Sequence, residues 1–302
     1  MTDDVLVVGE ALVDVVVRAD GTRVEHPGGS AANVAVALGR LGRGVRFASA
    51  WADDRYGALL VEHLAGSGVV LAGDPHVLAR TSSAEATIAA DGSASYVFDF
   101  DWRLGPVPRE PAPLAVHTSS VAAVLAPGAD DVRALLGDLR ATSTVTYDVN
   151  ARPAVTGAGP EVVAGVEQVA ALADVVKASD EDLRTLWPGG TVREAADRLL
   201  SLGPAAVVVT LGEGGAEWLD AARSVRVASQ RVEVADTIGA GDTFGAGLLD
   251  ALWSRGRLGA GSRAALRELP QDEVRDVLAH AAAAAAVTVS RPGADPPWRH
   301  EL

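Results

Sequence analysis

The most constraining feature of this sequence is a regular alternation between short apolar runs typical of buried strands and longer stretches with helical periodicity. The strand-like runs are Val5–Val8, Val45–Ala50, Ala115–His117, Ala122–Leu125, Val145–Asp148, Val175–Lys177, Ala206–Thr210 and Arg231–Val234. The helical stretches are Ala31–Leu41, Gly57–Ala65, Asp130–Leu139, Val192–Leu202 and Gly241–Leu252. This alternation predicts an α/β fold in which helices cover both faces of a mostly parallel sheet.

Several polar residues follow these strand-like runs. They are Asp14, Asp148, Thr210 and Asp236. Ligands of open α/β sheets bind beyond the carboxyl ends of the strands, so we expect these side chains to gather at one edge of the sheet.

Two segments depart from the alternation and are typical of hairpins. The first pairs Val13–Val17 with Arg23–Glu25. The second pairs Ser83–Ala89 with Ser95–Phe100 around Asp91-Gly92, and Asp-Gly is a strong hairpin turn signal. Because strands of alternating polarity need one covered face, these hairpins predict a small sheet beside the main one.

The segment Asp236–Leu249, with the sequence DTIGAGDTFGAGLL, joins a glycine turn to the start of a helix. The first N–H groups of a helix lack internal partners and carry partial positive charge, and glycine lets a phosphate approach the backbone. A carboxylate at this turn, Asp242, would repel a bound phosphate, but it suits a group that takes a proton from an attacking hydroxyl. The alternative interpretation is a tight turn with Asp242 as the helix N-cap.

A second glycine-led helix lies near the N-terminus, in HPGGSAANVAVALGRLG from His26 to Gly42. Gly28 and Gly29 precede apolar residues at helical spacing. Asn33 falls in the first turn, where its amide can donate to and accept from a sugar hydroxyl. Taken alone, this segment is more typical of a helix packed on a sheet than of a ligand site.

Together the two segments resemble the signatures of the ribokinase-like carbohydrate kinases of the phosphofructokinase-B type. The resemblance covers nearly the whole chain, with four motifs in the family's order: GEALVDVV (Gly9–Val16), PGGSAANVA, VVVTLGEGGAEW (Val207–Trp218) and DTIGAGDTF. It implies a ribokinase-like three-layer α/β/α fold, formed as a single kinase domain over residues 1–302. The hairpins, at about 13–26 and 82–101, would then form a lid over the sugar that pairs in a homodimer.

The resemblance also implies roles for individual residues. Asp242 stands at the position of the catalytic base, and the amide groups of Gly239, Ala240 and Gly241 form the anion hole. GEALVDVV resembles the family's first strand, which ends in a sugar-binding Asp. The implied sugar-binding residues are Asp14, Gly28, Gly29, Asn33 and Arg152. The implied nucleotide-binding residues are Lys177, Ser179, Thr210, Gly212, Gly215, Thr237, Gly239 and Gly241.

Two further segments resemble those of fructokinases and 2-keto-3-deoxygluconate kinases. YDVNARP (Tyr147–Pro153) is similar to their Asp-Pro-Asn-x-Arg-Pro segment, in which Arg152 offers a fixed fork of donors to the substrate. KASDEDL (Lys177–Leu183) is similar to a fructokinase motif that helps to organise magnesium and phosphate. Asp182 is implied as a metal contact through water, with a shorter side chain than the usual Glu. Ser179 followed by acidic residues is also a sound helix cap.

Composition narrows the class of protein. The formal net charge of −14 argues against nucleic acid or an anionic membrane as a partner. The absence of cysteine excludes disulfides and thiolate chemistry, and Lys177 is the only lysine, so a Walker-type P-loop is not expected. No early apolar segment has the length of a signal peptide and no run of about 20 apolar residues is present, so we expect a cytoplasmic enzyme. The six histidines lack metal-site spacing and are interpreted as surface or packing residues.

The residues and the resemblance together predict an ATP-dependent, fructokinase-like kinase of a sugar hydroxyl, with Mg²⁺ as cofactor and K⁺ left open. Ribose, 2-keto-3-deoxygluconate and nucleosides remain alternative substrates, because Val149 and Ser30-Ala31 depart from the fructokinase pattern. A nicotinamide oxidoreductase would use the same class of sheet, but no Gly-x-Gly-x-x-Gly follows the first strand. A non-catalytic sugar or nucleotide sensor is the third alternative, and Asp242 argues against it.

Overall fold

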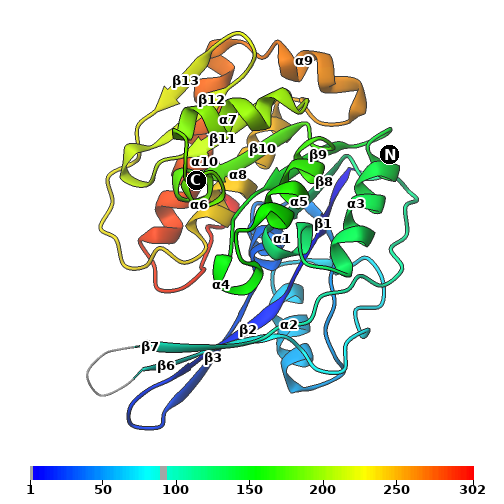
Figure 1. Cartoon of the computed structure of the whole chain (residues 1–302), viewed down its shortest axis with the longest axis vertical. Helices are drawn as coiled ribbons and strands as arrows, with labels where there is room; N and C mark the ends of the chain where they lie inside the picture. The colour runs from blue at the N-terminus through cyan, green and yellow to red at the C-terminus, as the bar shows by residue number, and fades with distance from the viewer. Residues whose placement is uncertain (1–2, 89–93) are drawn as a thin grey trace.

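The apolar runs form one large sheet at the centre of the molecule (Figure 1). The computed structural model describes residues 3–88 and 94–302. Within these residues the large sheet has the strand order β13-β12-β11-β10-β9-β8-β1-β4-β5. Its strands are β1 (Asp4–Val8), β4 (Gly44–Ala48), β5 (Val70–Leu71), β8 (Ala115–Ser119), β9 (Thr144–Asp148), β10 (Val175–Ser179), β11 (Ala206–Thr210), β12 (Ala216–Leu219) and β13 (Ser224–Val227). The pairs from β5 to β11 are parallel, while β11, β12 and β13 pair antiparallel, which confirms a mostly parallel sheet.

Helices cover both faces of this sheet because successive residues of each buried strand point to opposite sides. In β1, Val5 and Val7 belong to one apolar core while Leu6 and Val8 belong to the other. The first core includes residues from α1 (Ser30–Arg40), α2 (Arg55–Ala65), α8 (Ala240–Ser254), α9 (Arg263–Arg267) and α10 (Gln271–Val289). The second includes residues from α3 (Gly128–Leu139), α5 (Pro160–Ala170), α6 (Asp180–Leu186) and α7 (Val192–Ser201). The three-layer α/β/α arrangement is therefore confirmed.

Short helices complete the chain. They are α4 (Pro153–Thr156), η1 (Ser120–Ala123), η2 (Gly212–Gly214), η3 (Ala260–Ser262) and η4 (Arg299–Glu301). In the part of the chain that the structure describes, no helix is both long and apolar enough to cross a bilayer.

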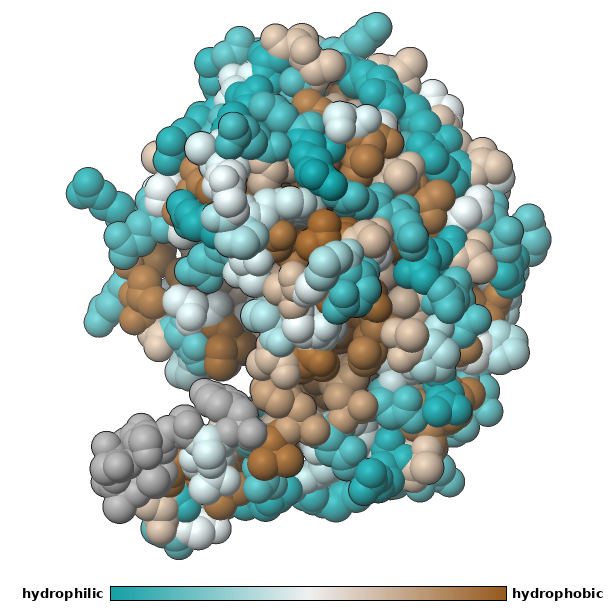
Figure 2. Space-filling view, in the orientation of Figure 1, coloured by the Kyte–Doolittle hydropathy of each residue, from teal (hydrophilic) through white to brown (hydrophobic). Residues whose placement is uncertain are grey.

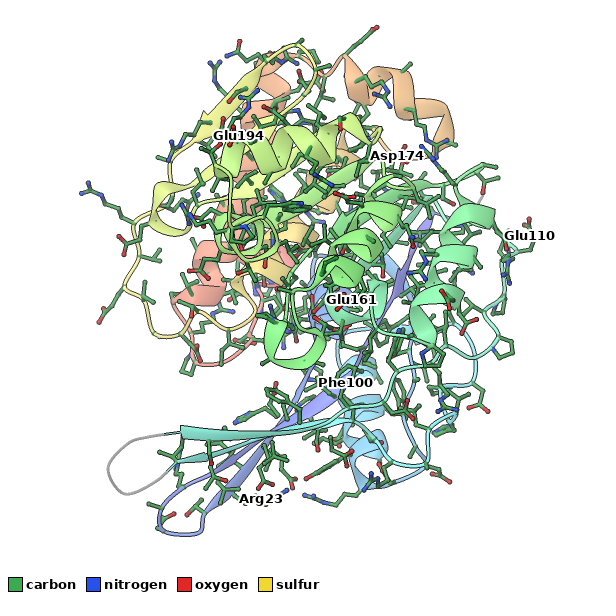
Figure 3. The ribbon with its side chains drawn as sticks, in the orientation of Figure 1. Arg23, Phe100, Glu110, Glu161, Asp174 and Glu194 are labelled. Atoms are coloured by element: carbon green, nitrogen blue, oxygen red, sulfur yellow. The ribbon has the colours of Figure 1, made fainter. Side chains whose placement is uncertain are left out.

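A separate small sheet projects from the body as an arm (Figure 1). Its strand order is β3-β2-β6-β7, with β2 (Leu12–Val17), β3 (Arg23–Gly28), β6 (Ser83–Ile88) and β7 (Ala94–Asp99). Both predicted hairpins are present in it, although the Asp91-Gly92 turn lies outside the described residues. Arg23, labelled in Figure 3, donates to Glu85 of β6 at 2.8 Å and to Tyr56 of α2 at 3.0 Å. These contacts tie the small sheet to α2.

Two of the predicted strands are wrong. Ala122–Leu125 is not a strand, because its first two residues end the buried 3₁₀ helix η1 and the next two form a turn and a bend, and a short apolar run does not distinguish such a helix from a strand. Arg231–Val234 has no regular structure, and its valines are exposed. No strand of the described part of the chain pairs with it, so the backbone there gains no ladder of hydrogen bonds.

The expected gathering of polar residues at one sheet edge is correct only in part. Asp148 and Thr210 are the last residues of β9 and β11, as predicted. Asp14 instead lies inside β2 of the small sheet, because the first core strand already ends at Val8. Asp236 follows an irregular segment, and its carboxylate accepts the backbone N–H groups of Ile238 and Gly293.

The C-terminal segment is held to α8 by a buried carboxylate, Asp250. Arg43 donates to it at 2.6 Å, and Nε2 of His280 lies 2.7 Å from it. Arg299 of η4 donates both to Asp250 and to the carbonyl oxygen of Leu41, which follows α1. This cluster joins α8, α10, the end of α1 and the C-terminus.

Candidate active site

The centre of the candidate site is Asp242, in the first turn of α8. Gly239 is the N-cap of this helix and has a left-handed backbone (φ 74°), which favours glycine. A Cβ atom added to Gly239 would lie only 2.7 Å from the Cβ atom of Ala294. Asp242 is therefore the third residue of the helix and not its N-cap, and the N-cap interpretation is wrong. Its carboxylate is only 5% exposed and lies near the positive end of the helix dipole.

Three side chains from distant parts of the chain hold the Asp242 carboxylate. The hydroxyl of Ser30, at the start of α1, donates to Oδ1 at 2.8 Å. The amide of Asn33, one turn along α1, donates to Oδ2 at 2.8 Å. The amide of Asn150, after β9, donates to Oδ1 at 3.2 Å and to the Ser30 hydroxyl at 2.7 Å. Ser30 and Asn150 were not predicted as site residues, although both lie inside motifs that the sequence analysis singled out.

The Gly28–Gly29 turn brings α1 close to this carboxylate. Gly29 has a φ of 105°, and an added Cβ would lie 2.6 Å from the carbonyl oxygen of Glu10. The side chain of Glu10 is buried beneath the turn and accepts the N–H of Ser30 at 3.1 Å. Burial raises the pKa of Glu10 to about 7, against hydrogen bonds from the backbone of Glu10 and Ser30. Glu10 was not predicted as a site residue. It lies inside GEALVDVV, but its distance in the sequence from the other motif residues does not indicate a role in the site.

Asp14 lies beside the same turn, on the small sheet. An added Cβ on Gly28 would come within 2.5 Å of Asp14 Oδ2. Asp14 is partly buried, and burial raises its pKa, while the nearby charges of His26 and Arg152 oppose the shift. Arg152 itself is exposed and donates to the carbonyl oxygens of Asn150 and Ala151. Arg152 is therefore near enough to influence Asp14 without a direct ion pair.

Lys177 lies directly beneath the start of α8. Its Nζ is 2.8 Å from Asp148 Oδ2, and both residues are buried, with 5% and 1% exposure. An added Cβ on Gly241 would lie 3.0 Å from this Nζ, so the absence of a side chain there leaves room for the ammonium group. Burial raises the pKa of Asp148, and the ammonium group of Lys177 opposes that shift. The only lysine of the chain thus supplies a buried positive charge behind the glycine turn.

Ser179 and Asp182 form a capping box at the start of α6. The Ser179 hydroxyl accepts the N–H of Asp182 at 3.0 Å, and Asp182 Oδ2 accepts the N–H of Ser179 at 2.7 Å. Asp182 Oδ1 accepts the N–H of Ala151 at 2.8 Å, which connects α6 to the segment that carries Asn150. Thr210 is the register partner of Ser179 on the neighbouring strand. The predicted helix cap is confirmed, and any metal contact of Asp182 would add to it.

The remaining predicted nucleotide residues lie around this centre. Gly212 and Gly215 are in the turn between β11 and β12, and Gly215 packs against the backbone of Val227 and Ala228. The carbonyl oxygen of Thr237 accepts the N–H of Ala240, which closes the turn before α8. Among the described residues, no group of three or more His, Cys, Asp or Glu side chains is placed to hold a metal ion.

This combination of fold and site is shared with known proteins. The family model described as "pfkB family carbohydrate kinase" matches residues 2–301. A fructokinase from Rhizobium leguminosarum bv. trifolii is 35% identical over 261 residues, which are 82% of this chain and 79% of the relative.

Two solved structures show the same likeness. The fructokinase of Xylella fastidiosa with bound ATP aligns with a TM-score of 0.84 and 26% identity, covering 100% of this chain and 95% of that one. A double mutant of the fructokinase of Vibrio cholerae O395 with fructose, ADP and potassium ion aligns with a TM-score of 0.77 and 26% identity, covering 97% of this chain and 95% of that one.

The fold and the comparisons define a phosphotransferase with a ribokinase-like architecture. The chain belongs to the PfkB family of carbohydrate kinases, and within it the chain is a fructokinase-like sugar kinase.

Proposed function

We propose that this chain transfers the γ-phosphate of Mg-ATP to a sugar hydroxyl, with fructose as the first substrate to test. The observation that carries the proposal is the buried Asp242 carboxylate beside the N–H groups that open α8. A base and an anion-binding helix start at the same turn suit transfer of a phosphoryl group to a hydroxyl. The solved relatives that hold ATP, or fructose with ADP, support this choice of substrates.

In the proposed reaction the sugar hydroxyl oxygen attacks the γ-phosphorus and the bond to the β,γ-bridging oxygen breaks, so that ADP leaves. Asp242 takes the proton of the attacking hydroxyl. The N–H groups of Gly239, Ala240 and Gly241 would stabilise the charge on the transferring phosphoryl group, and the N–H of Ala240 would exchange its 3.3 Å bond to the Thr237 carbonyl oxygen for the phosphoryl oxygen. The buried ammonium group of Lys177 lies behind Gly241 and adds positive potential at this point.

The sugar would lie between the Gly28–Gly29 turn and Asp242. Asn33 is hydrogen-bonded to Asp242, and Gly28 borders Asp14, so these groups form one surface. Arg152 is exposed, and its long side chain could approach the sugar from the solvent. This arrangement supports Asp14, Gly28, Gly29, Asn33 and Arg152 as substrate-binding residues.

The nucleotide would follow the strand ends from β10 to the turn after β11. Ser179, Thr210, Gly212, Gly215 and Thr237 are the proposed contacts, together with Lys177 and the glycine turn. Mg²⁺ keeps several waters and binds mainly substrate phosphates in kinases, so a dedicated protein cage is not required. Asp182 would contact the ion through water, and K⁺ is retained as an additional ion because it is bound in the Vibrio cholerae relative.

The test measures ADP release from Mg-ATP with fructose, ribose, 2-keto-3-deoxygluconate, tagatose and nucleosides as acceptors. We expect turnover with one sugar and a fall in kcat of several orders of magnitude in Asp242→Asn, because the proton acceptor is removed. Asp138→Asn, an exposed carboxylate on α3, is the matched control and should keep full activity. An unchanged kcat in Asp242→Asn would refute the role of Asp242. Nucleotide binding without any turnover would favour a sensor.

We also propose that the small sheet acts as a lid within a single kinase domain and pairs with a second copy. Its edge strand β7 exposes Val97 and Phe98, with 65% and 41% of their surface accessible. Figure 2 shows polar and apolar side chains mixed on the side of this sheet that faces the viewer. A charge in this strand should prevent pairing, so Phe98→Asp is expected to halve the mass measured by light scattering. Val70→Asp, at an exposed valine of the edge strand β5 of the large sheet, is the matched control and should leave the mass unchanged. An unchanged mass would contradict pairing through the lid. Because ATP is the proposed donor, we propose the cytoplasm as the site of action.

A further inference from the structure

We propose that Ser30 and Asn150 act as positioning residues that occupy Oδ1 of Asp242, so that Oδ2 is the atom that accepts the substrate proton. This inference rests on the proposed role of Asp242 as the base. It adds to that role a choice between two chemically equivalent oxygens, and it assigns a task to two side chains outside the predicted site.

The occupancy of the two oxygens differs. A carboxylate offers about four lone-pair positions, two on each oxygen. Oδ1 accepts the Ser30 hydroxyl at 2.8 Å and the Asn150 amide at 3.2 Å, so both of its positions are used. Among the residues that the structure describes, the Asn33 amide is the one donor to Oδ2, at 2.8 Å, which leaves one position open. An incoming hydroxyl therefore finds its acceptor on Oδ2.

The direction of the hydrogen bond between Ser30 and Asp242 follows from the groups that meet there. A hydroxyl has one hydrogen and two lone pairs. The Asn150 amide donates to the Ser30 oxygen at 2.7 Å, and the hydroxyl oxygen of Ser119 lies 2.9 Å away. An ionised carboxylate only accepts hydrogen bonds, so the 2.8 Å contact with Oδ1 requires the Ser30 hydrogen to point to Asp242. The backbone N–H of Ser30 donates in turn to the buried carboxylate of Glu10, and this contact holds the backbone of Ser30 in place.

The backbone supports this network at a conformational cost. Among the described residues, the non-glycine residues with positive φ are Asn150, at 35°, and Ser120, at 55°. Asn150 belongs to the network and Ser120 directly follows Ser119. Such conformations are disfavoured for side-chain-bearing residues and persist where surrounding contacts enforce them, commonly at functional sites. Asn150 therefore lies in a loop that delivers a side chain to Asp242, and Ser120 follows the residue whose hydroxyl contacts Ser30.

Asn33 connects the open position to the sugar. It donates to the same Oδ2 that retains a free lone pair. A hydroxyl bound beside Asn33 is therefore adjacent to Oδ2, while Oδ1 faces Ser30 and Asn150. The network holds the carboxylate plane so that the basic oxygen faces the substrate side.

The test is a double-mutant cycle in the full-length enzyme with its best sugar and Mg-ATP. Ser30→Ala should lower kcat about tenfold to a hundredfold, with KM for ATP changed less than about threefold, because orientation of the base is lost while nucleotide binding is kept. In the Asp242→Asn background the same change should alter the residual rate less than about twofold, since there is no base left to orient. Asn150→Gly, which tolerates positive φ, provides a second variant with the same expectations.

Ser143→Ala is the matched control, because Ser143 is a buried serine whose hydroxyl donates to a backbone carbonyl away from the site. It should reduce stability without lowering kcat. The inference would be overturned if Ser30→Ala lowered the rate equally in both backgrounds. It would also be overturned if neither Ser30→Ala nor Asn150→Gly lowered kcat. Either result would leave Asp242 as the base. Full activity of Asp242→Asn would instead overturn the proposed function itself.

Discussion

Replacing Lys177 with methionine should test the buried ion pair beneath the glycine turn. The change keeps a long apolar side chain and removes the charge that faces Asp148 at 2.8 Å. Asp148 is 1% exposed, so water cannot replace the lost partner. Removing one member of a buried ion pair costs about 3–5 kcal/mol, because the other charge remains desolvated. We therefore expect the free energy of unfolding to fall by about that amount at pH 8.

The cost should decrease as the pH falls. Burial already raises the pKa of Asp148, and the loss of Lys177 removes the charge that opposed this shift. Between the unfolded value of about 3.9 and the raised value, the folded protein binds a proton that the unfolded chain does not. Stability of the variant should therefore rise as the pH is lowered through this range, by up to about 1.4 kcal/mol for each pH unit.

Urea unfolding at pH 6 and pH 8, followed by tryptophan fluorescence, measures both effects. Arg80→Met, at a site where the side chain is 77% exposed, is the control and should change stability by less than about 1 kcal/mol. The double variant Lys177→Met/Asp148→Asn should recover most of the loss, because neither member of the pair is then left charged without its partner. An equal loss at both pH values, or a double variant no more stable than Lys177→Met, would refute this reasoning.

Two other variants probe the frame of the site. Gly29→Ala places a methyl group 2.6 Å from the Glu10 carbonyl oxygen at a φ of 105°, so unfolding in urea should show a loss of at least about 2 kcal/mol, and wild-type stability would contradict the geometry. Burial alone would raise the pKa of Asp250, but hydrogen bonds from His280 and Arg299 outweigh it and hold the pKa well below its usual range. The contribution of the Asp250 carboxylate to the free energy of unfolding is therefore complete above about pH 4 and is lost as the pH falls through the lowered pKa. Asp250→Asn should accordingly be less stable than wild type at pH 7. It should also lose less stability than wild type when the pH is lowered to about 3. Parallel acid unfolding curves would argue against this assignment.

Much of the fold could be predicted because it depends on local pattern. The stretches that became α1 and α8 have apolar residues at helical spacing behind glycine turns, and the buried parallel strands are continuous apolar runs. The pattern was insufficient where burial depends on a distant partner. Arg231–Val234 alternates like a strand but pairs with no strand among residues 3–88 and 94–302, while the short antiparallel strands β12 and β13 were not predicted as a pair.

The residues of the candidate site that follow glycine turns could be predicted, but the hydrogen bonds between its distant residues could not. The glycine turn marks Asp242, and the second glycine pair marks Asn33. The Ser30–Asp242 hydrogen bond spans 212 positions in the sequence and the Asn150–Asp242 bond spans 92. Such contacts depend on how the loops meet above the sheet, and no spacing or periodicity in the sequence encodes them.

The buried position of Lys177 makes this protein unusual for amine-directed chemistry. Its side chain is 6% exposed, and it is the only lysine in a chain whose other basic side chains are arginine or histidine. An acylating reagent added to the folded protein should therefore leave Lys177 untouched. Lys177 would be acylated only when the region beneath the glycine turn opens. The rate of its modification would report the opening of this one region in real time.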